Sequence, residues 1–330
     1  MSTRMIAGID IGGTKCASIL GAVDAQNQLE VLGKTVVSTA DYPDPYQMIG
    51  KLQEELEALL NVRSISMHSL EAIGISCGGP LDSKEGVILS PPNLPGWDEI
   101  PIVRLFNERF HIPTFVQNDA NACALAEWLM GAGRGTSNMI FLTFGTGMGA
   151  GLILNGKLYS GTNDLGGEVG HIRLAPEGPV GFGKAGSFEG FCSGGGIAQL
   201  AQSIVTRKLE NNIPVGFCTS LEEVPQLDAK KVAAAAHAGD PAALEIIRTS
   251  AEFLGKGLAV LIDILNPECI VIGSIFARNE ELFKPFAEKI IREEAIPGAV
   301  EKCTLKPAEL GESVGDFAAL GVAVNGRNLD

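Results

Sequence analysis

The feature of the sequence that most constrains the fold is a strand, a glycine turn and a returning strand that occur twice, about half a chain apart. The first copy is GIDIGGTKCASIL, residues 8–20, and the second is FLTFGTGMGAGLIL, residues 141–154. Glycine lets the backbone approach a ligand that any Cβ atom would exclude, and the N–H groups of such a turn form a concave anion site. Two such turns from two related halves could hold one polyphosphate between two domains. A single copy could also be a β-hairpin whose turn needs glycine.

The first turn adds chemistry to this backbone pattern. Asp10 ends the first strand, and Gly12, Gly13, Thr14 and Lys15 follow it. The hydroxyl of Thr14 and the charge of Lys15 suit phosphate oxygens. A carboxylate at Asp10 would repel bare phosphate, but it suits a Mg²⁺ ion that the phosphates also hold.

Apolar spacing predicts the remaining elements. Ile49, Leu52, Leu56, Leu59 and Leu60 recur on one face of a helix. The expected strands are 6–10, 16–20, 27–39, 72–76, 114–117, 139–144, 151–154 and 269–272; the expected helices are 49–60, 103–110, several from 196 onward, and 313–325. This alternation predicts an α/β fold with a partly parallel sheet. The glycine-rich segment 155–196 is long for a connection, which indicates functional loops.

Composition bounds the class of protein. The 330 residues suffice for two domains, and a net charge of −14 argues against nucleic acid or an anionic membrane as partner. Phosphate must then be held by local N–H groups and metal. Seven cysteines without a CxxC pattern indicate reduced thiols in a cytoplasm. The first residues show no apolar signal segment, and no apolar run has membrane-spanning length. We therefore expect a cytoplasmic protein.

Two motifs of other nucleotide-binding folds can be dismissed. A Walker loop ending in GKT at 33–35 would need glycine at position 28, where Gln28 stands. The stretch Gly145 to Ala150 matches a relaxed dinucleotide fingerprint, but a strand follows it, whereas that fingerprint opens a helix.

Isolated polar residues indicate a site for a hydroxyl-rich ligand. Asn118 and Asp119 lie between a strand and an alanine-rich helix, where a carboxylate can act as a base or simply cap the helix. Glu168 and His171 are three residues apart and would share one face of a helical turn, although a lone histidine is often structural. Glu189 stands among glycines with no helical reason to be there.

Together these motifs resemble the ROK family of sugar kinases, which also includes sugar-responsive repressors. The matching segments, in order, are DIGGTK (10–15), CGGP (77–80), NDAN (118–121), GTGMGAG (145–151), EVGHI (168–172) and EGFCSG (189–194). The resemblance implies a two-domain actin/hexokinase-type (ribonuclease H-like) α/β fold with a cleft that binds ATP and sugar. It implies a small N-terminal domain, 1–118 plus 310–330, and a large C-terminal domain, 119–309.

The resemblance also implies residue roles. Asp119 would be the general base that takes the proton from the 6-hydroxyl of the sugar, and Asp10 would hold Mg²⁺ through water. The implied sugar contacts are Gly79, Asn93, Asn118, Asp119, Glu168, His171 and Glu189. The implied ATP contacts are Gly12, Gly13, Thr14, Lys15, Gly145, Thr146, Gly147, Gly194 and Gly273. Phosphoryl transfer needs positioning, a charge-neutralising metal and a placed base more than covalent help, and this set provides them.

One segment departs from the family pattern. Many ROK proteins carry CxCGxxGCxE after the histidine, and the three cysteines join that histidine around a structural Zn²⁺. Here Val180, Phe182 and Ser187 replace the cysteines, and the final Glu189 is kept. His171 and the distant Cys192 cannot supply the ligands that zinc needs. We predict no zinc, with the loop held instead by packing of Phe182 and Phe188.

The leading hypothesis is an ATP-dependent hexose kinase that forms a homodimer and uses Mg-ATP. Glucose is the default substrate, and N-acetylhexosamines, fructose, allose and β-glucosides remain open, so that a fructokinase or a β-glucoside kinase is an alternative. A non-catalytic sugar sensor is another, although Asp119 and both glycine turns are intact. A DNA-binding repressor is disfavoured, because the family's repressors carry a winged-helix segment before the first motif, whereas here nine residues precede Asp10.

Overall fold

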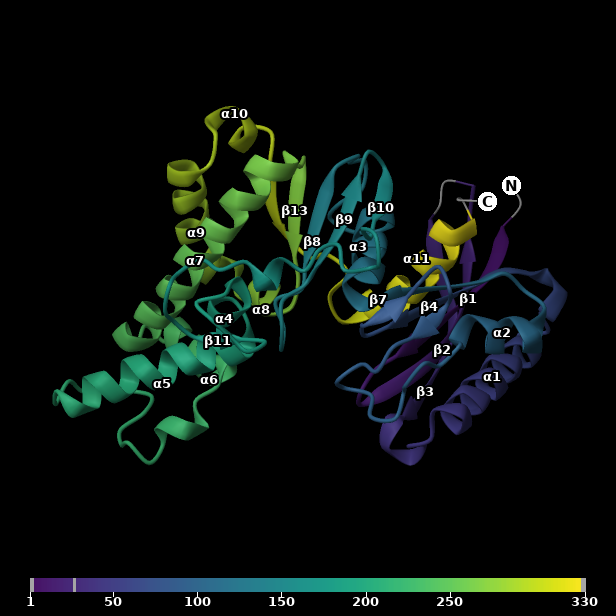
Figure 1. The fold of residues 1–330 in the computed structure, drawn as a ribbon, viewed down its shortest axis with the longest axis horizontal. Helices are drawn as coiled ribbons and strands as arrows, with labels where there is room; N and C mark the ends of the chain where they lie inside the picture. Colours follow the sequence, from purple (N-terminus) through teal and green to yellow (C-terminus); the bar gives the residue numbers. More distant parts are fainter. Residues whose placement is uncertain (1–2, 26–27, 328–330) are drawn as a thin grey trace. The chain divides into compact units, whose positions relative to one another are not determined.

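The computed structural model describes residues 3–25 and 28–327. The chain divides into two compact units, each described here by itself (Figure 1). Unit 1 comprises Met1–Gly135, Gly151–Gly166 and Glu309–Asp330, and unit 2 comprises Thr136–Ala150 and Gly167–Ala308. The predicted domains differ from these units in assigning 119–135 and 151–166 to the second domain. The predicted boundary stays a prediction.

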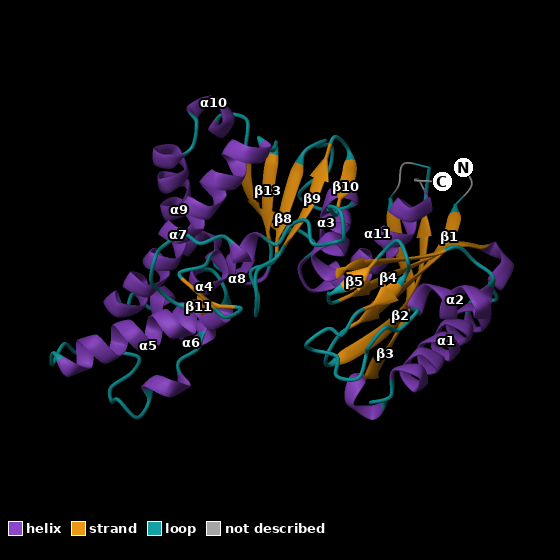
Figure 2. Cartoon of the chain, viewed as in Figure 1, coloured by secondary structure: helices purple, strands orange, loops and turns teal. Residues whose placement is uncertain are grey.

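Unit 1 contains most of the strands of the first half of the chain (Figure 2). Its strands are β1 (Arg4–Ile11), β2 (Lys15–Val23), β3 (Leu29–Ser38), β4 (Leu70–Cys77), β5 (Leu81–Asp82), β6 (Val87–Ile88), β7 (Thr114–Asn118) and β10 (Lys157–Tyr159), with β9 (Ala150–Leu154) at its boundary. Its helices are η1 (Thr39–Asp41), α1 (Pro45–Val62), η2 (Met67–Ser69), α2 (Ile102–Phe110), α3 (Asp119–Leu129), η5 (Gly311–Ser313) and α11 (Val314–Arg327). These elements confirm the strands and helices predicted over this part of the chain. Residue 27, where the third predicted strand begins, lies outside the described residues.

The main sheet of unit 1 has five strands in the order β3-β2-β1-β4-β7. Strands β1, β2 and β3 pair antiparallel, whereas β1, β4 and β7 run parallel. In this register Asp10 lies opposite Ser76, and Cys77 lies opposite Asn118. The carboxyl ends of three neighbouring strands therefore bring together residues that are far apart in sequence.

The side chains of β1 point alternately to the two faces of this sheet, and both faces are buried. Ile9 packs in a core with α1 and α2, and Ile6 packs on the other face with α11, through residues such as Leu320 (Figure 1). Successive side chains of a strand point to opposite faces, so a strand buried on both sides is apolar almost throughout. Helix α11, from the end of the chain, thus packs on the sheet that the start of the chain forms.

Helix α3 anchors two further segments of unit 1. Gly151 of β9 lies so close to α3 that a Cβ atom there would be 2.5 Å from the carbonyl oxygen of Ala120. The Glu127 side chain is fully buried and accepts hydrogen bonds from the N–H groups of Ala132, Glu309 and Leu310 at 2.8, 3.2 and 2.9 Å. This carboxylate fixes the chain just before α11 begins.

Unit 2 is richer in helix (Figure 2). Its strands are β8 (Met139–Leu142), β11 (Val180–Gly181), β12 (Lys184–Ala185), β13 (Cys269–Ile272) and β14 (Thr304–Pro307). Its helices are η3 (Val169–His171), α4 (Phe188–Phe191), α5 (Gly194–Glu210), η4 (Val224–Gln226), α6 (Ala229–His237), α7 (Pro241–Leu265), α8 (Ser274–Arg278), α9 (Glu280–Glu294) and α10 (Pro297–Val300). Strands β8, β13 and β14 are parallel, and β8 and β13 are buried along their whole length.

The segment 155–196, predicted to be irregular, contains short elements instead. It holds β10, η3, the hairpin of β11 and β12, α4 and the start of α5. Within residues 3–25 and 28–327, no helix combines the length and the apolar character needed to cross a membrane.

Candidate functional site

The ends of β1, β4 and β7 bring together the predicted site residues of unit 1. The register places Asp10, the CGGP turn that follows β4, and Asn118 side by side. A Cβ atom on Gly79 would lie 3.9 Å from the Cβ atom of Asn118, which brings this turn next to the start of α3. Ligands of open α/β sheets bind outside the carboxyl ends of the strands, so this edge is the expected place for them.

The first glycine turn joins β1 to β2 at the same edge. The N–H group of Gly12 donates to the carbonyl of Lys15 at 3.1 Å, and the Thr39 hydroxyl donates to the carbonyl of Gly12 at 2.7 Å. A Cβ atom on Gly13 would lie 2.6 Å from the carbonyl oxygen of Asn93, so only glycine fits. The structure therefore brings the predicted sugar contact Asn93 against the predicted phosphate turn.

Asp10 sits in an electrostatically costly position. Burial and then the neighbouring Asp316 raise its pKa to about 6, with a smaller contribution from Asp119, while Lys34 and Lys15 oppose the shift. Mg²⁺ is bound through one or two carboxylates together with substrate phosphates. The lysines near Asp10 do not fully offset the cost of its negative charge, and a bound Mg²⁺ would offset it. The residues present therefore suit Mg²⁺.

Asn118 and Asp119 divide two tasks at the start of α3. The Asn118 side chain caps the helix, accepting from the N–H group of Asn121 at 2.8 Å. The alternative that Asp119 is the N-cap is therefore wrong. Asp119 accepts from the N–H group of Ala120 at 2.8 Å and remains open to solvent at its surface, while the surrounding protein raises its pKa above the ordinary value.

The second glycine turn lies in unit 2, where further predicted ligand contacts gather around it. The N–H group of Gly145 donates to the carbonyl of Gly147 at 3.2 Å, and the Thr143 hydroxyl accepts from the N–H group of Gly149 at 2.8 Å. Gly194, at the start of α5, donates its N–H group to the carbonyl of Gly145 at 2.8 Å. Ser193 caps that helix by accepting from the N–H group of Gly196 at 3.0 Å.

Gly273 and Thr146 complete the predicted ATP contacts of unit 2. Gly273 follows β13 and donates its N–H group to the carbonyl of Leu142 at 3.0 Å, which places it beside the end of β8. A Cβ atom on Gly145 would lie 3.5 Å from the hydroxyl of Ser274. Thr146 is exposed at the tip of the turn. The structure therefore brings Gly145, Gly194 and Gly273 together.

Glu189 connects the predicted sugar residues of unit 2 with this glycine turn. Its Oε2 atom accepts from the N–H group of Met148 at 3.0 Å. Gly170 packs beside both, because a Cβ atom there would lie 2.4 Å from the carbonyl oxygen of Met148 and 3.2 Å from the Cβ atom of Glu189. One oxygen of Glu189 thus supports the turn, and Oε1 is the atom suited to a ligand hydroxyl.

Glu168 and His171 lie in the same region, Glu168 as the N-cap of η3 and His171 as its last residue. The His171 N–H group donates to the carbonyl of Glu168 at 3.2 Å, and both residues are exposed. The predicted helical turn is confirmed as a 3₁₀ turn. The imidazole of His171 contacts the Phe182 ring, with ring centroids 5.0 Å apart.

The segment that replaces the family's zinc ligands forms a hairpin, β11 and β12. Among residues 3–25 and 28–327, no group of at least three His, Cys, Asp or Glu side chains could hold a metal ion. Val180, Phe182 and Ser187 have no ligating thiolate, so this segment does not fit zinc. Phe188 is fully buried, as predicted for packing support, whereas Phe182 is 77% exposed and does not join the core.

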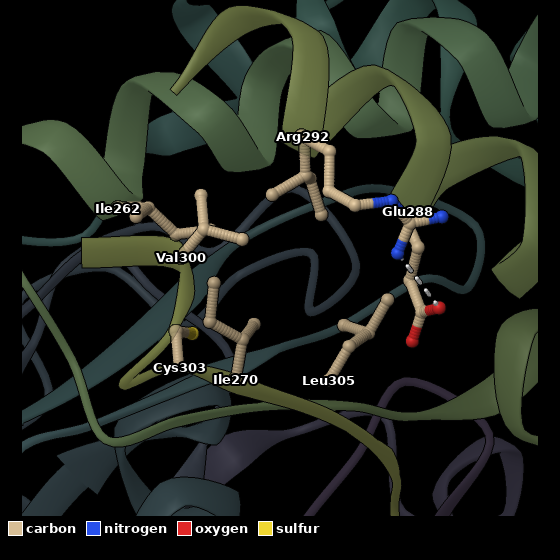
Figure 3. A pocket seen from close by; sticks show the side chains of 8 residues that line it. Ile262, Ile270, Glu288, Arg292, Val300, Cys303 and Leu305 are labelled. Atoms are coloured by element: carbon tan, nitrogen blue, oxygen red, sulfur yellow. Dashed lines mark ion pairs between the residues drawn. The ribbon is translucent and has the colours of Figure 1, made fainter. Parts of the chain in front are cut away.

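A separate pocket of about 150 Å³ lies elsewhere in unit 2 (Figure 3). Its lining is Ile262, Ile270, Glu288, Ile291, Arg292, Val300, Cys303 and Leu305, and Glu288 and Arg292 form an ion pair at 3.6 Å. None of the residues predicted for catalysis, sugar or ATP lines it.

Several residues that shape the site were missed by sequence reasoning. Asp316 raises the pKa of Asp10 and pairs with Lys34, and Thr39 and Thr143 hold the two glycine turns. Thr143 lies two residues before the second turn, so its role in holding that turn could have been predicted from its position. Asp316 and Lys34 lie far from Asp10 in sequence and gave no signal.

Comparison with known proteins places these features in a family pattern. A sequence model of the ROK family matches residues 6–324. A glucokinase from Halalkalibacterium halodurans is 33% identical over 320 residues, covering 96% of this chain and 93% of that protein.

Solved structures give the same result. A ROK hexokinase from Thermus thermophilus has a TM-score of 0.78 and 30% identity, covering 97% of this chain and 98% of that one. A ROK family glucokinase from Streptomyces griseus, solved with glucose and AMPPNP, has a TM-score of 0.70 and 29% identity over 97% of this chain and 99% of that one. These likenesses confirm the predicted actin/hexokinase-type α/β fold.

Proposed function

The chain belongs to the ROK family and is a sugar kinase of that family, and we propose that it transfers the γ-phosphoryl group of ATP to the 6-hydroxyl of a hexose, with Asp119 as general base. The observation that carries the proposal is the position of Asp119. It lies in the first turn of α3, at the edge of the sheet where the first glycine turn and the CGGP turn also end, and its pKa is raised.

The chemistry asked of Asp119 is modest. Its carboxylate would accept the proton of the sugar hydroxyl as that oxygen forms its bond to the γ-phosphorus and ADP departs with the bonding electrons. A carboxylate with a raised pKa is a better proton acceptor than one held at its ordinary value. Asn118 caps α3 through its oxygen, so its amide N–H groups are left to donate to a sugar oxygen.

Phosphate binding would rest on backbone N–H groups of both units. Gly12, Gly13, Thr14 and Lys15 would meet phosphates from unit 1, and Gly145, Thr146 and Gly147 from unit 2, with Gly194 and Gly273 beside the adenosine. Asp10 would hold Mg²⁺, which when bound neutralises charge on the phosphates. The net charge of −14 makes such local contacts necessary, because the overall field opposes an anion.

Sugar recognition would draw on hydroxyl partners in each unit. Gly79, Asn93 and Asn118 supply them in unit 1, and Glu168, His171 and the Oε1 atom of Glu189 supply them in unit 2. Glucose is the substrate we propose first, because the relative from Halalkalibacterium halodurans is a glucokinase and the Streptomyces griseus structure holds glucose. A homodimer in a cytoplasm remains our prediction for the assembly and its location.

The test is ADP release from Mg-ATP with a panel of glucose, fructose, allose, N-acetylmannosamine, N-acetylglucosamine and a β-glucoside. A glucose response that Asp119→Asn abolishes would support the proposal in full. A response to another sugar alone would correct the substrate. No turnover with any sugar, with sugar binding still visible by thermal shift, would replace the kinase by a sugar sensor.

A further inference from the structure

The tip of the β11–β12 hairpin carries an unusual residue for its backbone. Phe182 and Gly183 form a two-residue turn, and both have positive φ, 45° and 74°. Such turns favour Asn-Gly, and a bulky residue in the left-handed region is strained. Phe182 is also 77% exposed, so burial does not compensate for this strain. An exposed aromatic residue that keeps a strained backbone indicates a role for its ring.

The Phe182 ring contacts the imidazole of His171. The centroids are 5.0 Å apart, and the planes meet at 76° in an edge-to-face arrangement, which aromatic pairs prefer. The same hairpin also holds the backbone of that histidine, because the Lys184 ammonium donates to the His171 carbonyl at 2.7 Å. His171 is therefore held at its ring and at its backbone by one short element.

The hairpin is anchored well enough to act as a support. The Gln199 amide of α5 accepts from the N–H group of Val180 at 2.8 Å and donates to its carbonyl at 2.9 Å. On the other strand, the Arg173 guanidinium donates to the Ala185 carbonyl at 2.7 Å. The hairpin therefore has fixed contacts with α5 on one side and with the segment after His171 on the other.

We propose that Phe182 is a positioning residue, and that this hairpin orients His171 in place of the zinc ion that the family pattern would put there. The hairpin holds two of the three replaced cysteine positions, Val180 and Phe182, and the third, Ser187, follows it as the N-cap of α4. Its Phe182 contacts the histidine that would be the fourth ligand. An aromatic edge and a backbone hydrogen bond need no metal, so the imidazole keeps both ring nitrogens for a ligand. The inference that this ligand is a sugar rests on the proposed function.

The first test observes His171 directly by NMR. The chain has four histidines, so the ring resonances of His171 can be assigned with a His171→Gln variant. Phe182→Leu keeps an apolar side chain but removes the ring current, and we expect the His171 ring protons to shift and broaden. Phe182→Tyr should restore the wild-type positions. Phe182→Gly relieves the strained backbone, so a shift in that variant comes from loss of the ring and not from a misfolded hairpin.

Val180→Ala is the matched control, since Val180 is 46% exposed on the same hairpin and does not form the ring contact. Its His171 resonances should stay in place. Unchanged His171 resonances in both Phe182→Leu and Phe182→Gly would overturn the proposal. Elemental analysis that finds one zinc per chain would overturn it as well.

The second test uses kinetics with whichever sugar the panel identifies. Loss of an aromatic pair should raise KM for the sugar in Phe182→Leu by about two- to tenfold, with KM for ATP unchanged and Phe182→Tyr near wild type. An equal rise in both KM values would show that Phe182 acts only on folding of unit 2. If the wild-type protein turns over no sugar, the proposed function fails, while the NMR experiment still decides whether Phe182 positions His171.

Discussion

The two glycine turns look alike in sequence, but the protein supports them in different ways. The first turn is closed by a bond between neighbours, Gly12 and Lys15, and by the Thr39 hydroxyl at the end of β3. The second turn is held by Glu189, about forty residues later in the chain, and by Gly194 at the start of α5. The first turn is thus nearly self-supporting, whereas the second depends on a residue predicted to bind the sugar.

This difference has a functional consequence. A sugar that engages Glu189 would act on the side chain that holds the N–H group of Met148 in the second turn. Within residues 3–25 and 28–327, no predicted sugar side chain hydrogen-bonds to the first turn, and Asn93 approaches Gly13 most closely through its backbone carbonyl. We therefore expect sugar and ATP binding to be coupled through Glu189, and much less through the first turn.

The largest effect is expected from removing the proposed general base of phosphoryl transfer, Asp119. Asp119→Asn keeps the size of the side chain and removes the base, so turnover should fall by about 10²- to 10⁴-fold while sugar affinity changes little. Steady-state kinetics and calorimetric titration measure the two quantities. Glu54→Gln, an exposed acid-to-amide change on α1, is the control. Near-normal turnover in Asp119→Asn would remove its role as base.

Glu189→Ala tests the support of the second turn. It leaves the buried N–H group of Met148 without its acceptor, so both KM values should rise, each by about ten- to a hundredfold. Glu189→Gln keeps an oxygen acceptor, and its KM for ATP should recover more than its KM for sugar. A rise in the sugar KM alone would contradict the coupling between sugar and turn.

Gly13→Ala tests the fit of the first turn. The added Cβ atom would lie 2.6 Å from the Asn93 carbonyl, so the turn must shift, and KM for ATP should rise on the order of tenfold. Gly50→Ala in α1, where an added Cβ atom meets nothing within 4 Å, is the matched control. Its KM values should equal those of the wild type. Equal kinetics in the two variants would show that the first turn tolerates a side chain.

Thr39→Val removes only the hydroxyl that supports the first turn from η1, directly after β3. Because the Gly12–Lys15 bond remains, KM for ATP should rise by only about two- to fivefold, with KM for the sugar unchanged. An effect as large as that of Glu189→Ala would show that the first turn also depends on distant support.

The smallest expected effect is on stability. The pKa of Asp119 is raised in the folded protein. The protein therefore loses stability as the pH rises from 3.8, the ordinary pKa of an aspartate, to the higher pKa of Asp119 in the folded state. Asp119→Asn cannot ionise, and its Tm relative to the wild type should therefore rise across that window and then level off. Because Asp119 is exposed to solvent, we expect this increase in the Tm difference to be small. Melting curves from about pH 4 to about pH 8 measure it, and a Tm difference that stays constant with pH would contradict the shift.

Local pattern was enough to predict most of the architecture. The apolar spacing of α1 and the apolar runs of β4 and β13 are confirmed. These features are local because a helix or strand repeats the same burial every few residues. The Asp119 cap was a wrong alternative, since caps at neighbouring positions differ by backbone angles that composition does not show.

The order of the residues is enough to predict the elements, the two glycine turns and the acids that follow the strands, and it shows that the zinc cysteines are replaced. The contacts of Asp316 with Asp10, Asn93 with Gly13, Glu189 with Met148 and Phe182 with His171 appear only in the folded chain. Periodicity records which side of an element is buried, whereas contacts between distant segments depend on strand register, on where the chain crosses and on single hydrogen bonds, none of which repeats along the chain.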